Sequence, residues 1–175
     1  MSYPFPNFTG HHHILIANIL KLSNCQKFLE LGIFDGLLTS HASKFIKKCV
    51  GVDISDEKII NKNFEFYKMT TTDFFKQNKE TFDVIFIDAD HSFESVKKDF
   101  ESSLKILNKH GLIFLHDTDP VSKKYLQNKY CSDCYKIIDY IKTNHKELNL
   151  INLPITEAGL TIVQRNNESR VSSYL

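Results

Sequence analysis

The sequence has no surplus of charge of either sign and very little arginine. Its 22 Lys and Arg residues face 21 Asp and Glu residues, which gives a formal net charge of +1. Only Arg165 and Arg170 are arginines, and both lie near the end of the chain. A dedicated nucleic-acid-binding protein usually carries a basic excess or a basic stripe. The even balance therefore argues against nucleic acid as the main partner, although it leaves room for a local basic patch.

Long apolar runs are also missing. The apolar runs are short, as at 84–87 and 112–115, whereas a membrane-spanning helix needs about 18 apolar residues. The first residues lack the basic stretch and apolar core of a signal peptide. We therefore expect a cytoplasmic protein without membrane contact, in which the four cysteines are free thiols: Cys25, Cys49, Cys131 and Cys134.

Composition and length predict one globular domain. The chain has 175 residues, of which 42% are hydrophobic and 25% charged, and this is enough to bury a core without disulfides. No repeat, low-complexity block or linker divides it. We expect a single domain over 1–175, with an extended N-terminal arm at 1–11 and a C-terminal tail at 166–175.

Short apolar segments alternate with segments of helical periodicity along the chain. The pattern predicts strands over 27–31, 49–54, 64–69, 82–88, 111–116, 148–153 and 159–164. It predicts helices over 12–22, 37–47, 57–62, 73–78, 92–107 and 122–144. Alternation of this kind is typical of an α/β fold with a doubly wound, mostly parallel sheet covered on both faces. The short connection at 154–159 requires an antiparallel last strand, so we expect a Rossmann-like sheet of seven strands.

Ligands of such sheets bind beyond the carboxyl ends of the strands. After the first strand, Glu30 precedes Gly32 and Gly36, which lie four residues apart before a helix. Two glycines allow the backbone to pass close to a ligand, but the full G-x-G-x-x-G pattern is absent, and a tight turn explains them as well. Asp53 follows the second strand, 21 residues after Gly32, where a carboxylate binds ribose hydroxyls. Its alternative role is a helix N-cap, for which Ser55 or Asp56 is a better candidate.

The ends of the next strands carry further polar residues. After the third strand, Thr72, Asp73 and Phe74 would hold an adenine through a carboxylate and an apolar wall, or Asp73 simply caps a helix. After the fourth strand come Asp88, Asp90 and His91, and His116 and Asp117 follow the fifth. If these two strands are neighbours, Asp88 and Asp117 face each other and provide two oxygen ligands for Mg²⁺.

These motifs together resemble class I S-adenosylmethionine-dependent methyltransferases. Glu30-x-Gly32-x-x-x-Gly36 resembles their first motif, and Asp53 resembles their acidic second motif. The run from Phe86 to His91, followed by His116-Asp117, is similar to two groups of O-methyltransferases. One is the cation-dependent catechol and caffeoyl-CoA type, and the other is the macrocin type that acts on small molecules and sugars. The resemblance covers about residues 26–165.

The resemblance implies a role for each matching position. It places the methionine part of S-adenosylmethionine at Glu30, Gly32 and Gly36, the ribose at Asp53, and the adenine at Thr72, Asp73 and Phe74. Asp88 would contact the cofactor and, with Asp117, a divalent cation. Thr118 stands where the cation-dependent group often has Asn or an acid, and a hydroxyl is a weaker ligand.

The predicted reaction is methylation of a hydroxyl on a small molecule or sugar. A base or a metal must make that hydroxyl nucleophilic, and His91 and Asp90 are both candidates for the base. The first alternative is a nucleic-acid methyltransferase, although the N/D-P-P-Y type of motif is absent after the fourth strand. The second is a non-catalytic cofactor-binding module. The sequence is compatible with a homo-oligomer, and the run 11–13 of three histidines is either a lid over the cofactor or a solvated segment.

Overall fold

The computed structural model describes residues 11–56 and 62–166. The predicted helix 57–62, the predicted arm 1–11 and the predicted tail 166–175 fall almost entirely outside these residues. Within the described part of the chain, no helix is long and apolar enough to cross a membrane.

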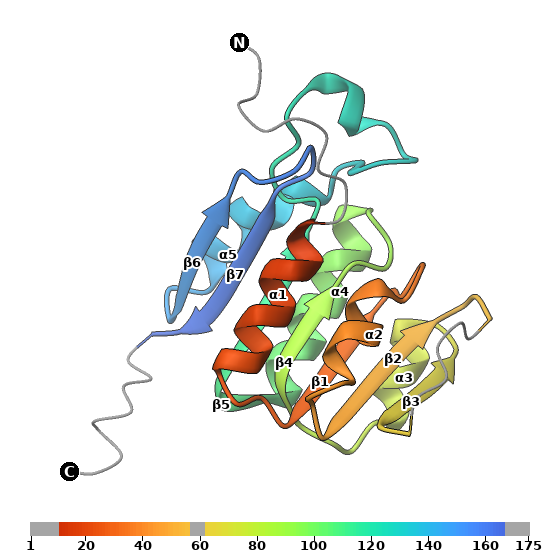
Figure 1. Ribbon diagram of the computed structural model, residues 1–175. Helices are drawn as coiled ribbons and strands as arrows, with labels where there is room; N and C mark the ends of the chain where they lie inside the picture. The colour runs from red at the N-terminus through yellow and green to blue at the C-terminus, as the bar shows by residue number, and fades with distance from the viewer. Residues whose placement is uncertain (1–10, 57–61, 167–175) are drawn as a thin grey trace.

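The described residues form a seven-stranded sheet with the strand order β3-β2-β1-β4-β5-β7-β6 (Figure 1). Strand β7 is antiparallel to both of its neighbours, and all other pairs are parallel. This confirms the predicted fold class. The strands are β1 Lys27–Leu31, β2 Lys48–Asp53, β3 Phe64–Lys68, β4 Phe82–Ile87, β5 Leu107–His116, β6 Leu148–Leu153 and β7 Leu160–Arg165.

Helices cover both faces of the sheet, as expected for apolar strands that alternate with amphipathic helices. The helices are α1 His11–Leu22 and α2 Leu37–Ala42 on one face, and α3 Thr71–Gln77, α4 Phe93–Ile106 and α5 Ile137–Asn144 on the other (Figure 1). Alternate strand residues supply the two cores because successive side chains point to opposite faces. Phe28, Phe86 and Phe114 pack under α1 and α2, whereas Leu29 and Ile85 pack under the other three helices.

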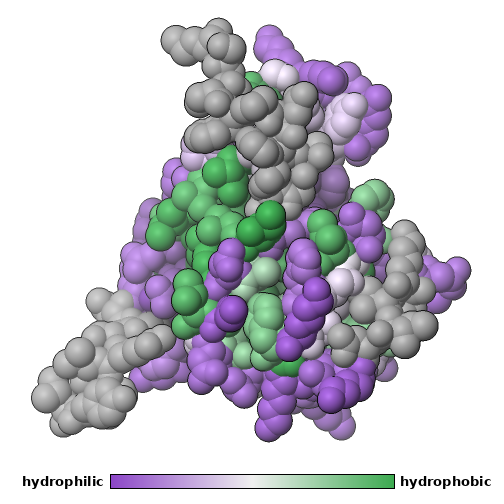
Figure 2. All heavy atoms as spheres, in the orientation of Figure 1, coloured by the Kyte–Doolittle hydropathy of each residue, from purple (hydrophilic) through white to green (hydrophobic). Residues whose placement is uncertain are grey.

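Figure 2 looks onto the α1 face, where apolar side chains gather over α1 and the neighbouring strands β6 and β7. Ile14 and Leu22 of α1 and Ile151 of β6 are among the exposed apolar side chains there. These two strands extend the sheet beyond the part that α1 covers, while α5 packs behind them (Figure 1).

The predicted helix 122–144 is wrong over most of its length. Two short 3₁₀ turns, Lys123–Leu126 and Cys134–Lys136, precede α5. Ser132 has a φ of 47°, which interrupts a right-handed helix. The buried thiols also tie this segment to the strand end: Cys131 Sγ donates to Asp117 Oδ1 at 3.2 Å, and Cys134 Sγ donates to the His116 carbonyl oxygen at 3.4 Å.

The boundaries of two other elements also differ from the predicted ones. Helix α2 ends at Ala42 rather than continuing to residue 47. Strand β5 begins at Leu107, the last residue of the predicted helix and four residues before the predicted strand, because Leu107 already pairs with Phe82 of β4.

Candidate active site

A pocket of about 350 Å³ lies beyond the carboxyl ends of β1, β2, β3 and β4. Gly32 and Asp53 line it from the ends of β1 and β2, Thr72 from the segment after β3, and Asp90 from the loop after β4. Asp99 closes it from α4. The position is the one at which a doubly wound sheet binds its ligand.

Gly32 brings the loop after β1 into direct contact with the end of β4. Its φ is +84°, in the region that favours glycine. A Cβ atom at this position would lie 2.2 Å from the carbonyl oxygen of Asp88 and 2.6 Å from Cα of Ala89. Because both contacts are with backbone, a side chain at residue 32 has no room unless the two loops separate.

Asp53, at the end of β2, binds the backbone of the same loop after β1. Its Oδ2 accepts hydrogen bonds from the backbone N–H groups of Ile33 at 2.8 Å and Phe34 at 3.2 Å, and Oδ1 accepts one from Ser55 at 2.8 Å. Burial raises the pKa of Asp53, but these donors outweigh it, so its pKa lies below the ordinary value. A charged carboxylate therefore stands at the pocket wall.

The structure places two residues expected at the adenine elsewhere. Phe74 is 1% exposed and lies in the core, 5.2 Å from the Tyr67 ring centroid. Asp73 is exposed, where it bonds to Lys76 at 2.7 Å and to Thr70 at 2.9 Å as part of the α3 cap. Of the three residues predicted for this position, Thr72 lines the pocket.

Asp99 is a pocket residue that sequence reasoning missed. It is 3% exposed and lies on the buried side of α4, between Val96 and Phe100. Burial raises the pKa of its carboxyl to about 6, although a hydrogen bond from Thr71 acts in the opposite direction. The sequence does carry a signal for Asp99, because this acid lies within the apolar stripe of an amphipathic helix. A buried acid in such a position needs a partner or a ligand.

Glu30 and Gly36 lie outside the described lining of this pocket. Glu30 is buried and accepts a hydrogen bond from the Thr39 hydroxyl. Burial raises the pKa of its carboxyl to about 8, so Glu30 is largely protonated at neutral pH. Gly36 precedes α2 with a φ of +71°. In this structure Glu30 therefore links β1 to α2, and Gly36 supplies the left-handed backbone before α2.

Acidic and histidine side chains meet at the ends of β4 and β5, which are neighbours as predicted. His91 Nε2 lies 3.1 Å from Asp117 Oδ2 and 3.6 Å from Asp88 Oδ1. His116 Nδ1 lies 3.2 Å from the same Asp88 oxygen and 3.5 Å from Asp117 Oδ1. The structure thus brings the two predicted aspartates together around two imidazoles.

These contacts decide the charges in the cluster. Burial raises the pKa of Asp88, but His116 and His91 outweigh it and hold the pKa well below its usual range. The contact with Asp88 raises the pKa of His91 to about 9 against the effect of burial, with further help from Asp117 and the Tyr130 carbonyl. Without a bound cation, a pKa raised to about 9 favours the protonated form of the His91 imidazole at neutral pH.

Thr118 does not turn towards this cluster. Its hydroxyl oxygen accepts a hydrogen bond from the Thr161 hydroxyl of β7 at 2.9 Å, and the residue is buried. Asp90, by contrast, accepts a hydrogen bond from the Ser92 backbone N–H at 2.7 Å. That bond is the main cause of a lowered pKa, so Asp90 carries a charge.

A second pocket, of about 540 Å³, opens on the other side of Asp90. One wall is the loop of Asp90 and His91, and the other is the 3₁₀ segment at the top of Figure 1, which contributes Leu126, Asn128 and Asp133. Asp90 belongs to the linings of both pockets. The site therefore consists of two adjoining chambers with the acid–histidine cluster beside them.

A family model described as a methyltransferase domain matches residues 29–118, just over half of the 175 residues. The chain belongs to this methyltransferase family. The match and the fold confirm the prediction of a class I S-adenosylmethionine-dependent methyltransferase. No curated protein matches the chain.

Solved structures share the fold at low sequence identity. An O-methyltransferase from Bacillus cereus, in complex with SAH, is 16% identical with a TM-score of 0.71, and the match covers 93% of this chain and 84% of that one. The O-methyltransferase TomG from Streptomyces achromogenes, in complex with SAM, is 12% identical with a TM-score of 0.71, covering 93% and 82%. The N-methyltransferase NodS from Bradyrhizobium japonicum is 13% identical with a TM-score of 0.64, covering 89% and 93%.

Proposed function

We propose that the protein transfers the methyl group of S-adenosylmethionine to a hydroxyl of a small molecule, with a sugar as the preferred class of acceptor. The observation that carries the proposal is the pair of adjoining pockets that share Asp90. One lies at the ligand-binding end of the sheet, and six of the seven residues that line the other are polar, which suits a hydroxylated acceptor. The two solved O-methyltransferases with the same fold, crystallised with SAM or SAH, support this reading.

The first pocket fits the cofactor. Its volume of about 350 Å³ lies within the range of small-molecule sites. Gly32 leaves the backbone of the loop open to the ligand, Asp53 offers a charged acceptor for ribose hydroxyls, and Asp99 offers one for the adenine amino group. When bound, the cofactor supplies a methyl group already activated on a sulfonium, so the protein contributes mainly by positioning.

The residues beside the second pocket prepare the acceptor. Asp90 is ionised and lies in both chambers, so it is the group placed to accept the hydroxyl proton in the ion-free protein. His91 is protonated there and would orient the acceptor as a hydrogen-bond donor. Asp88 and Asp117 would hold a divalent cation such as Mg²⁺, which lowers the pKa of a bound hydroxyl. One carboxylate oxygen from each of Asp88 and Asp117 lies within 4.8 Å of the other, which supports this assignment.

Asp53→Ala is expected to weaken S-adenosylmethionine binding by tenfold or more. A hydrogen bond to a charged group contributes about 1.5–3 kcal/mol, and about 1.4 kcal/mol corresponds to tenfold in affinity. Isothermal titration calorimetry on the folded variant measures the change. Asp56→Ala is the matched control, because Asp56 is an exposed acid three residues away that pairs with Lys68. Equal affinities for wild type and Asp53→Ala would refute the ribose assignment.

The acceptor class is tested by transfer of labelled methyl from S-adenosylmethionine to parallel panels of sugars, phenols and RNA. We expect label on a hydroxyl of a small acceptor, at a rate well above that for RNA. Preferential labelling of RNA would favour the nucleic-acid alternative. Tight cofactor binding with no transfer to any acceptor would favour the non-catalytic module.

A further inference from the structure

The first turn of α1 places a histidine against the ends of β4 and β5. His12, Ile16 and Leu20 recur every four residues, so they share the face of α1 that packs on the sheet. His12 is 5% exposed, and its ring centroid lies 4.1 Å from that of His116 and 5.9 Å from that of Phe86. The histidine run at 11–13 therefore contributes a buried imidazole rather than only solvated side chains.

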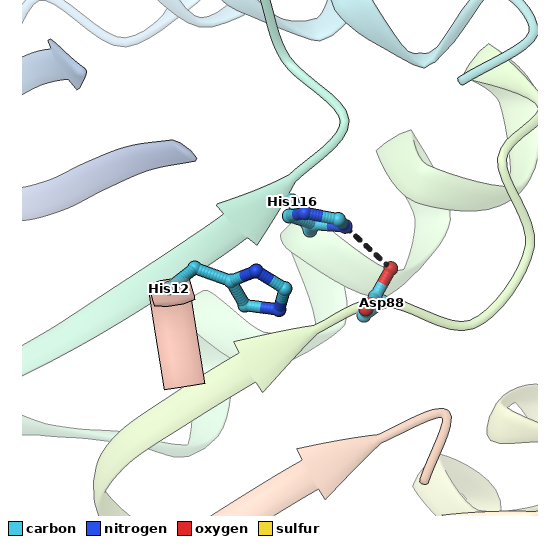
Figure 3. Close-up of side chains that lie close together, drawn as sticks. All are labelled: His12, Asp88 and His116. Atoms are coloured by element: carbon cyan, nitrogen blue, oxygen red, sulfur yellow. Dashed lines mark hydrogen bonds and ion pairs between the residues drawn. The ribbon is translucent and has the colours of Figure 1, made fainter. Parts of the chain in front are cut away.

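This imidazole lies beside Asp88. His12, Asp88 and His116 each offer one ligand atom, and these atoms all lie within 4.8 Å of one another. Figure 3 shows that the His12 ring extends from α1 towards the space between His116 and Asp88, which come from the ends of β5 and β4. His116 Nδ1 already contacts Asp88 Oδ1 at 3.2 Å, while no hydrogen bond from the described part of the chain reaches its buried Nε2.

Two imidazoles and one carboxylate are a characteristic ligand set. Mg²⁺ prefers oxygen ligands and keeps several of its waters. Imidazole nitrogen instead suits later transition-metal ions such as Fe²⁺, Co²⁺, Ni²⁺ and Zn²⁺, and two histidines with one carboxylate can occupy three positions of such an ion. The Phe86 ring adds an apolar wall beside both histidines.

We propose that His12, Asp88 and His116 bind a divalent transition-metal ion that fastens α1 to the ends of β4 and β5. The site shares Asp88 with the proposed active site, but ion binding here does not depend on methyl transfer. The ion would join residues that are 76 and 28 positions apart in the sequence, so it binds the folded chain in preference to the unfolded one.

Preferential binding to the folded chain predicts thermal stabilisation. At an ion concentration of about 100 times the Kd, Tm should rise by about 5 °C or more for a domain of this size. The rise should be larger with Zn²⁺ or Co²⁺ than with Mg²⁺, which gives a measurement that needs neither cofactor nor acceptor.

The test uses the full chain after metal removal with a chelator and dialysis. Calorimetry and thermal unfolding are measured with Zn²⁺, Co²⁺ and Mg²⁺, on wild type and on His12→Leu, which keeps the α1 face apolar and filled. His13→Ala is the control, because His13 neighbours His12 on the same helix but belongs to neither candidate metal group.

We expect one Zn²⁺ or Co²⁺ per chain whose binding depends on His12, held at least tenfold more tightly than Mg²⁺. His12→Leu should weaken that binding tenfold or more and abolish the rise in Tm, while His13→Ala should stay within about threefold of wild type. Unchanged affinity in His12→Leu, equal affinity for Mg²⁺, or no binding of any ion would each overturn the proposal. S-adenosylmethionine binding is measured on the same preparations. Cofactor binding without metal binding would overturn the metal proposal alone, whereas loss of cofactor binding in the wild type would count against the proposed function.

Discussion

Gly32→Ala is expected to reduce S-adenosylmethionine affinity by at least about a hundredfold and to lower Tm. The new Cβ would lie 2.2 Å from the Asp88 carbonyl oxygen, and the φ of +84° disfavours any side chain. The loop after β1 and the end of β4 must separate to make room. Because both segments line the cofactor pocket, binding and stability should fall together.

Gly51→Ala is the control for this variant. Its Cβ would also meet close neighbours, but these are side-chain atoms of Ile33 and Phe64 rather than backbone. Side chains can rotate away, so the cost should be smaller and confined mainly to stability. Calorimetry and thermal unfolding report the two effects separately. Wild-type affinity in a folded Gly32→Ala protein would show that the close approach of the two loops does not form the pocket.

Asp117→Asn should lower methyl transfer by about a thousandfold while S-adenosylmethionine affinity changes by less than about threefold. The carboxylate faces His91 and His116 and lies outside the described lining of the cofactor pocket. Removing the charge of Asp117 weakens cation binding at the cluster and removes a negative charge beside His91 and His116. Both effects raise the energy of the transition state for methyl transfer. Asparagine tolerates the φ of 60° found at this residue, so the backbone should be preserved.

The measurement is kcat with the acceptor that the transfer assay selects, together with calorimetry for the cofactor. Asp119→Asn is the control, because Asp119 bonds to Asn152 two residues beyond the cluster. A kcat within about threefold of wild type would contradict the role of Asp117. Full wild-type activity in EDTA, with elemental analysis showing metal-free protein, would contradict the role of a cation while leaving Asp90 as the base.

The sheet could be predicted because each strand is marked by its own short apolar run, and several such runs indicate the same fold. The apolar runs around Ile85 and Ile113 identify buried strands, and the alternation of helices between them determines parallel pairing. The neighbouring positions of β4 and β5 then follow from the fold class, and with them the meeting of Asp88 and Asp117.

Residues whose environment depends on distant packing were harder to predict. Phe74 follows a strand, and sequence alone does not distinguish an aromatic pocket wall from a core residue. Asp99 lies in an apolar stripe where its exposure to a cavity depends on the loops of other strands. The segment 122–144 has helical spacing, but the contacts of Cys131 and Cys134 with the end of β5 override it. The charge of His91, a candidate base, could not be read from the sequence either, because its pKa depends on its contacts with Asp88 and Asp117.

The segment between β5 and α5 has a consequence for how this enzyme family can diversify. It forms one wall of the second pocket, yet among the described residues it adds no strand to the sheet. Short turns, two thiols and single hydrogen bonds to neighbouring loops and strands hold it in place. Substitutions, insertions or deletions there can reshape this pocket without shifting the register of any strand. If this pocket takes the acceptor, as we propose, selection for a new substrate can act on one stretch of chain and leave the pocket at the strand ends unaltered.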